Sequence, residues 1–129
     1  PTPTPSLNFS YEYMNDDCGH TGCGLWFRLQ NTGGVALESF SAQVDSKNDA
    51  GAVISSGSTT SNTFLATKYV TTSDIDRADP GKTVYVLVSG LPNPLGTTGT
   101  ASMTVCTQDG QGGDCLTKNI NFTHDVGSR

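Results

Sequence analysis

Short stretches of alternating apolar and polar residues recur along the chain, and no stretch sustains the period of an amphipathic helix. Apolar side chains take every second position in five segments, at 7–13, 25–29, 40–44, 101–105 and 120–122. This alternation predicts strands with one buried face and one solvated face. A sixth segment, 83–88, is almost continuously apolar, which predicts a central strand covered on both faces.

Turn signals separate these segments. The run Asn31–Gly34 predicts a turn, and 79–82 places Pro80 and Gly81 at the positions that a type II turn prefers. The polar stretch 46–62 predicts a loop with one short strand at 52–54, and 63–70 predicts a further strand. A Ser three residues before an acid at 73–77 predicts a short capped turn.

Seven or eight short strands without helices are typical of an all-β, antiparallel β-sandwich. At 129 residues the chain has the length of one domain, and its 15 glycines and 15% charged residues fit a β protein. We expect residues 1–6, which alternate Pro and Thr, to form an extended linker or a disordered N-terminus. The sandwich is expected at 7–124, followed by a short tail at 125–129.

The charge balance bears on partners. Twelve acidic and seven basic residues give a formal net charge of −5, without a Lys/Arg cluster that could follow a phosphate backbone. We therefore expect neither nucleic acid nor an anionic membrane surface as a partner. No apolar run has the length of a membrane span, so membrane insertion is not expected either.

Two segments carry a family resemblance. Phe27–Gly33 ends a strand in Asn-Thr-Gly, and 79–86 leads a Pro-Gly turn into a hydrophobic strand. This combination resembles bacterial immunoglobulin-like surface modules of the CARDB type, a cell-adhesion-related domain, over roughly residues 7 to 123. The resemblance implies an immunoglobulin-like sandwich from a secreted or surface protein, and it leaves the cysteines unexplained.

Four cysteines form two closely spaced pairs, Cys18/Cys23 and Cys106/Cys115. Chain entropy gives about 2–3 kcal/mol for each local bridge and nearly 5 for a long-range one, whereas the Gly-rich polar intervals favour local pairing. Four cysteines allow three pairings, and of these we favour Cys18–Cys23 with Cys106–Cys115. Two disulfides indicate an oxidising, extracellular or cell-surface setting. A four-cysteine zinc site does not fit, because eight residues separate the second pair.

Acidic residues near both cysteine pairs provide candidate oxygen ligands for calcium, which would be the candidate cofactor. They are Asp16, Asp17, Asp109 and Asp114. Their spacing matches neither an EF-hand nor a nonapeptide calcium repeat, and the alternative is that they form solvated turns.

An aromatic platform for a sugar is a second candidate site. Trp26 shares the outward parity of Arg28, and with Tyr85 or Tyr69 it could offer flat rings for stacking. The alternative, which we favour, is that this lone Trp covers an edge or packs under a loop.

Catalysis has little support in the sequence. His20 and His124 are the only histidines, and no nucleophile, phosphate-binding or metalloprotease motif accompanies them. We predict a non-catalytic extracellular structural or adhesive module whose edge strands could add to a neighbouring chain and build filaments. The alternative is a carbohydrate-binding module, with calcium as its candidate aid.

Overall fold

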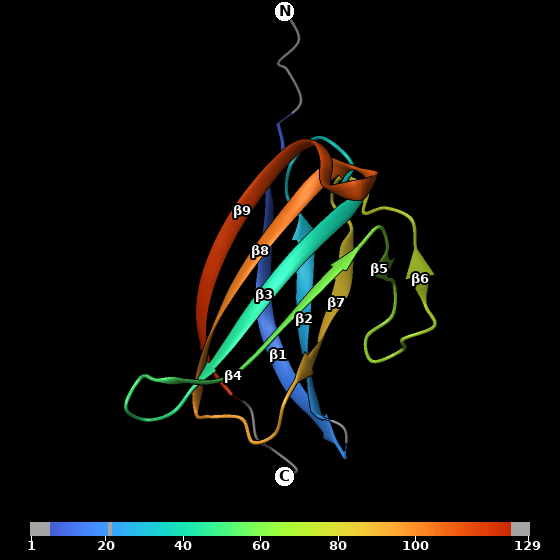
Figure 1. The fold of residues 1–129 in the computed structure, drawn as a ribbon. Coiled ribbons are helices and arrows are strands. Elements are labelled where there is room, and N and C mark those ends of the chain that lie inside the picture. Colours follow the sequence, from blue (N-terminus) through green and yellow to red (C-terminus); the bar gives the residue numbers. More distant parts are fainter. Residues whose placement is uncertain (1–5, 21, 125–129) are drawn as a thin grey trace, which may run out of the picture.

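The computed structural model describes residues 6–20 and 22–124, so most of the expected N-terminal linker and the tail at 125–129 lie outside the described residues. Nine strands and one short 3-10 turn make up this part of the chain (Figure 1). In chain order they are β1 (Phe9–Gly19), β2 (Gly22–Asn31), β3 (Ser39–Lys47), β4 (Val53–Ser61), β5 (Phe64–Leu65), β6 (Asp74–Ile75), β7 (Thr83–Leu91), β8 (Thr98–Gln108), η1 (Asp109–Gln111) and β9 (Gly112–Thr123).

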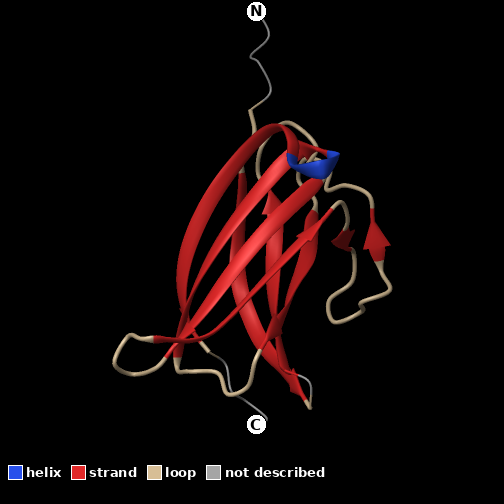
Figure 2. Cartoon of the chain, in the orientation of Figure 1, coloured by secondary structure: helices blue, strands red, loops and turns tan. Residues whose placement is uncertain are grey.

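The strands form two antiparallel sheets that pack as a sandwich. The first sheet has the order β1-β2-β7-β5-β6 and the second has the order β4-β3-β8-β9. Strands dominate the whole described chain, as Figure 2 shows. The all-β prediction is therefore confirmed, with nine strands in place of the seven or eight expected. Within 6–20 and 22–124, no helix has the length and apolarity that crossing a bilayer requires.

The core lies between the sheets and is built from the residues that alternate inward. The strands that face each other contribute Phe9, Tyr11, Leu25, Phe27, Leu29, Phe40, Ala42, Val44, Val84, Val86, Val88, Ala101, Met103 and Val105. Tyr11 also links the two layers, because its hydroxyl donates to the backbone carbonyl of Lys118 at 2.6 Å. Burial raises the pKa of Tyr11 to about 12, against a smaller opposing effect of a backbone hydrogen bond with Met103.

Four expectations from the pattern differ from the structure. The stretch 46–62 contains the nine-residue strand β4 in place of a loop with a short strand. Of the strand expected at 63–70, only Phe64–Leu65 is extended, and Asp74–Ile75 forms β6 where we expected a capped turn. The outer face of β7 is only half-covered, because its odd-numbered residues Tyr85 and Leu87 are intermediate in exposure.

A buried asparagine joins the two segments that carried the family resemblance. The Asn31 side chain donates to the carbonyls of Val35 and Ala78 at 2.8 and 2.9 Å and accepts from the Gly33 N–H. Its backbone pairs with the second segment, through Asn31 N to Lys82 O and Gly81 N to Asn31 O. Gly81 has a φ of 84°, as position i+2 of a type II turn requires. The two segments therefore form one corner of the sandwich.

A β-bulge in β1 decides which acidic side chain points inward. The register against β2 shifts between Tyr13 and Asn15, so Tyr13 faces Phe27 while Asp16 faces Leu25. A bulge adds one residue to the strand and thereby reverses the face on which later side chains lie. Asp16 consequently enters the core layer, and Asn15 and Asp17 point outward.

The described chain enters at one end of the sandwich and leaves at the other (Figure 1). Asp16, near the end of β1, contacts His124, which follows the end of β9. Phe9, at the start of β1, is seven residues away, or roughly 23 Å along an extended strand. The entering segment is fastened by hydrogen bonds from Gly33 N to Asn8 O and from Gly34 N to Ser6 O.

Candidate functional site

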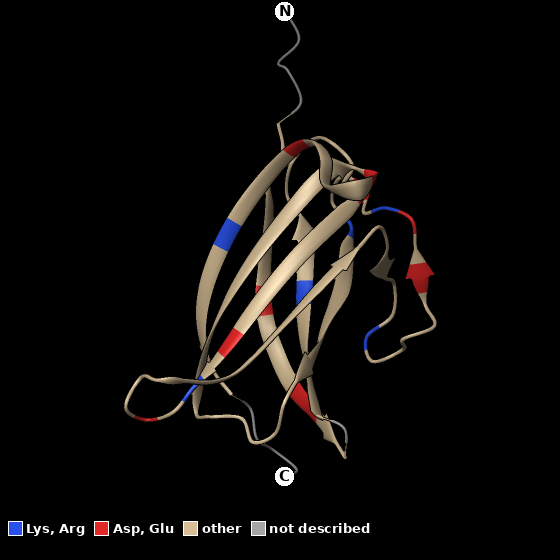
Figure 3. Ribbon diagram, viewed as in Figure 1, with Lys and Arg blue, Asp and Glu red and all other residues tan. Residues whose placement is uncertain are grey.

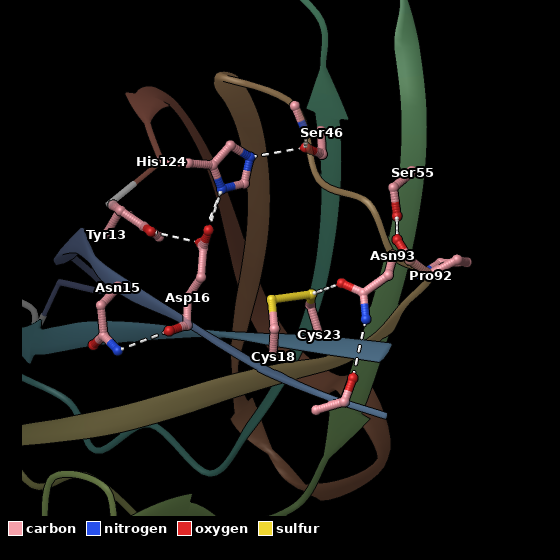
Figure 4. Close-up of a disulfide and its surroundings, with 12 residues drawn as sticks. Tyr13, Asn15, Asp16, Cys18, Cys23, Ser46, Ser55, Pro92, Asn93 and His124 are labelled. Atoms are coloured by element: carbon pink, nitrogen blue, oxygen red, sulfur yellow. Dashed lines mark hydrogen bonds and ion pairs between the residues drawn. A yellow bond between two sulfur atoms is a disulfide. The ribbon is translucent and has the colours of Figure 1, made fainter. Parts of the chain in front are cut away.

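A buried chain of polar side chains closes the end of the sandwich where the described residues finish. His124 Nδ1 lies 2.9 Å from Asp16 Oδ1, and His124 Nε2 lies 2.8 Å from Ser46 Oγ (Figure 4). The Tyr13 hydroxyl donates to the same Asp16 carboxylate at 2.5 Å. The residues come from β1, from β3 and from the position after β9, so the chain of contacts joins both sheets.

The order Ser, His, Asp matches the connectivity of a hydrolase triad, which is recognised by geometry and not by sequence position. The surroundings differ from those of a nucleophile. Ser46 is completely buried, and its hydroxyl oxygen accepts the N–H of Gly96 at 2.8 Å. Ser46 Oγ therefore cannot reach a substrate carbonyl in this conformation. The arrangement can hold three strands together by satisfied buried hydrogen bonds.

No pattern in the sequence predicted this cluster. Ser46 continues the inward alternation of Phe40, Ala42 and Val44, but a serine at a strand end is ordinary. Asp16 reaches the interior only because of the bulge, and no residue of β1 predicts a bulge at this position. The other histidine, His20, is exposed just after β1 and takes no part in the network.

Both disulfides have the pairing that we favoured, Cys18–Cys23 and Cys106–Cys115. Each joins residues that face each other directly on neighbouring strands, β1 with β2 and β8 with β9. Cys23 and Cys106 are buried, so each bridge is part of a hairpin ladder and more than a clamp on a surface loop. Asn93 Oδ1 lies 2.8 Å from Cys23 Sγ, and Asn93 Nδ2 donates to Gly19 O.

The four aspartates expected to bind calcium do not come together. Asp109 lies in η1 and Asp114 near the start of β9, at the end of the sandwich where Gln108 and Gln111 hydrogen bond with Ser39 at the start of β3. Asp16 contacts His124, which in turn contacts Ser46. Ser46 is seven residues beyond Ser39 along β3, so the two ends of this strand are roughly 23 Å apart. Figure 3 shows acidic residues at both ends of the sandwich. No group of three or more His, Cys, Asp or Glu side chains positioned for a metal occurs in the described residues.

Trp26 lies on the outer face of the first sheet, as its parity predicted, but it is only 2% exposed. The segment between β5 and β6 folds over it, and the Tyr69 ring packs edge-on at 5.3 Å between centroids. Tyr69 is held there by its hydroxyl, which donates to Asn15 Oδ1 at 2.7 Å. Trp26 is therefore no platform for a sugar in this structure, because the segment that follows β5 covers its face. Tyr85 lies on β7, two residues from Leu87, the residue that pairs with Trp26. It lines an open hollow on the same outer face.

Comparison with known proteins adds little to this geometry. No protein-family model and no curated protein matches the chain. Among solved structures, target SoR45 of the Northeast Structural Genomics Consortium aligns at 10% identity with a TM-score of 0.39, over 97% of this chain and 89% of that chain. A similarity this low transfers neither fold nor function.

Proposed function

We propose that the protein is a non-catalytic, extracellular structural module of immunoglobulin-like type that links its neighbours along the long axis of the sandwich. The observation that carries the proposal is the arrangement of the first and last strands. Chain entry and exit lie at opposite ends, and each of these two edge strands is fastened to its neighbour by a disulfide.

Tension along this axis would load β1 and β9 first. Both run along the axis, so pulling on either end shears the strand against its neighbour and stresses many ladder hydrogen bonds together. The Cys18–Cys23 bridge removes slack from the β1–β2 hairpin, and Cys106–Cys115 does the same for β8–β9. The two disulfides therefore lie in the two hairpins that would carry the tension.

The edges of the sandwich favour a serial link over filament growth by strand addition. Lys118 points inward from the edge strand β9, with its ammonium 5.5 Å from the centroid of the Phe9 ring. The edge strand β1 carries the bulge at Tyr13/Asn15. Inward-pointing lysines and bulges are devices that block edge-to-edge pairing.

The second part of the proposal is that the protein is not a catalyst. The reactivity of Ser46 tests this part. A fluorophosphonate probe labels serines that a neighbouring histidine activates and that solvent can reach. We expect no labelling of the folded protein, because Ser46 is completely buried. Labelling that is lost in Ser46→Ala would mean that the module is an enzyme.

Single-molecule pulling in two geometries tests the link itself. In the first geometry, handles are attached at the two ends of the chain. In the second, one handle stays at the C-terminal end of the chain and the other is inserted at Gly51, in an exposed turn at the same end as His124. The proposal requires a clearly higher unfolding force in the first geometry, where strands shear, than in the second, where they peel. Equal forces would argue against a module that transmits tension.

A further inference from the structure

The open half of the outer face of the first sheet forms a polar hollow of about 630 Å³. Its volume lies within the range of small-molecule sites, on the order of 300–1,000 Å³. Two rows of side chains from β1, β2 and β7 make its floor. They are Glu12, Arg28 and Tyr85 in one row, and Ser10, Gln30 and Thr83 in the other.

The segment 66–73 covers the neighbouring part of this face, and the hollow itself is lined by β1, β2 and β7. Residues 66–73 cross the outer face from β5 to β1, and Tyr69 rests on Trp26, two residues along β2 from Arg28. Tyr69 has a φ of 65°, a left-handed conformation that is strained for a bulky residue. Its contacts with Trp26 and Asn15 hold it in this conformation, so the part of the face around Trp26 is covered and the hollow is the part that stays open.

The side chains of the floor have the chemistry of a site for a neutral sugar. The Tyr85 ring offers a face to the C–H groups of a pyranose. The guanidinium of Arg28 presents planar donors, the carboxylate of Glu12 accepts, and the Gln30 amide does both, which suits neighbouring hydroxyls. Arg28 and Glu12 form an ion pair, so the floor carries no net charge. An anionic ligand would compete with Glu12 and would meet a chain of net charge −5.

We propose that this hollow binds one or two residues of a neutral polysaccharide, with Tyr85 as the stacking ring and Arg28, Glu12 and Gln30 as the hydroxyl-binding groups. The site does not depend on the linking role, because binding uses the outer face of the first sheet, including Ser10 and Glu12 of β1, and needs neither neighbour to be attached. A linking module with such a site would also attach its neighbours to a glycan surface.

Affinity electrophoresis in native gels tests the site. The gels contain laminarin, galactomannan or hydroxyethyl cellulose as neutral probes, or polygalacturonate as an acidic one. We expect at least one neutral probe to retard the protein. Tyr85→Ala should weaken that retardation by about tenfold or more, as for a central aromatic contact. Arg28→Lys should also weaken it, because it keeps the charge and loses the planar donor pair.

Thr100→Ala is the matched control, since Thr100 lies on the outer face of the second sheet. It should bind like the original protein, and near-ultraviolet circular dichroism shows that each variant is folded. If Tyr85→Ala fails to fold, Arg28→Lys and Gln30→Ala decide the matter. Three results would overturn the site: no retardation by any neutral probe, retardation by polygalacturonate alone, or equal losses in Thr100→Ala and the floor variants.

Discussion

His124 joins the two sheets at the end of the sandwich where the described chain leaves it. Its ring is buried between a carboxylate from β1 and a hydroxyl from β3. A buried polar group is stabilising only while its partners stay in place, so each member of this network makes the others necessary.

Replacing His124 with Ala should lower the free energy of unfolding by about 2–4 kcal/mol, because the buried Asp16 carboxylate and the Ser46 hydroxyl each lose a partner. Urea denaturation measures the loss. The control is His20→Ala, which alters an exposed residue and should change the free energy by less than about 0.5 kcal/mol. Similar values for the two variants would mean that the network contributes nothing to stability.

Tyr11 gives the fold a dependence on alkaline pH. Its pKa is raised by burial from an ordinary value of 10.0 to about 12. The folded state therefore keeps the phenol neutral where the unfolded chain has begun to ionise. The resulting stability is fully present below pH 10 and is lost as the pH rises toward 12.

An absorbance titration at 295 nm should show one tyrosinate transition near pH 12 that Tyr11→Phe removes. The loss of unfolding free energy between pH 10 and 12 should also be smaller in this variant. A Tyr11 transition near pH 10 in the folded protein would contradict the burial of its hydroxyl.

At the scale of elements, β4 shows what the alternation of residues cannot reveal. Its inner face carries Ser55, Gly57, Thr59 and Ser61, so the strand has no apolar period. Gly57 is required there, because a Cβ would lie 2.6 Å from the Leu91 side chain of the opposite sheet. The close approach of β4 and β7 at this edge leaves no room for a row of large side chains. Tertiary contacts therefore create this strand.

The disulfides permit a test of one element pair at a time. Replacing Cys106 and Cys115 together with Ser should lower the free energy of unfolding by about 2–3 kcal/mol, which is the chain entropy of a ring of this size. The β8–β9 hairpin remains paired along its length, so the variant should still unfold in one cooperative transition. Loss of near-ultraviolet circular dichroism at room temperature would show instead that the core depends on the bridge.

The edge strand β9 should become adhesive when its inward lysine is removed. A neighbouring chain that paired with β9 would have to bury the charge of Lys118. Lys118→Ile removes this charge and puts an apolar side chain in its place. We expect concentration-dependent association in sedimentation velocity experiments. The control Thr117→Val alters the outward face, keeps Lys118, and should remain unassociated. If Lys118→Ile also stays unassociated, the lysine does not guard this edge.

For the whole molecule, the pattern of residues was enough for the class of fold, the inward faces of the strands with apolar alternation and the Pro-Gly turn, and it favoured the cysteine pairing that the structure has. It failed where distant segments decide the outcome. The burial of Trp26 depends on a segment more than forty residues later in the chain, and the inward turn of Asp16 depends on a bulge. The proposed calcium ligands looked close because they flank cysteines, yet the two hairpins point to opposite ends.

Pulling the oxidised and the reduced protein from its two ends tests the central claim most directly. If the disulfides fasten the strands that take the tension, reduction should lower the unfolding force. The five-residue and nine-residue separations that the bridges lock should add roughly 40 Å to the released length. An unchanged force together with the added length would contradict the account, because it would show that the bridges do not strengthen the strands under load.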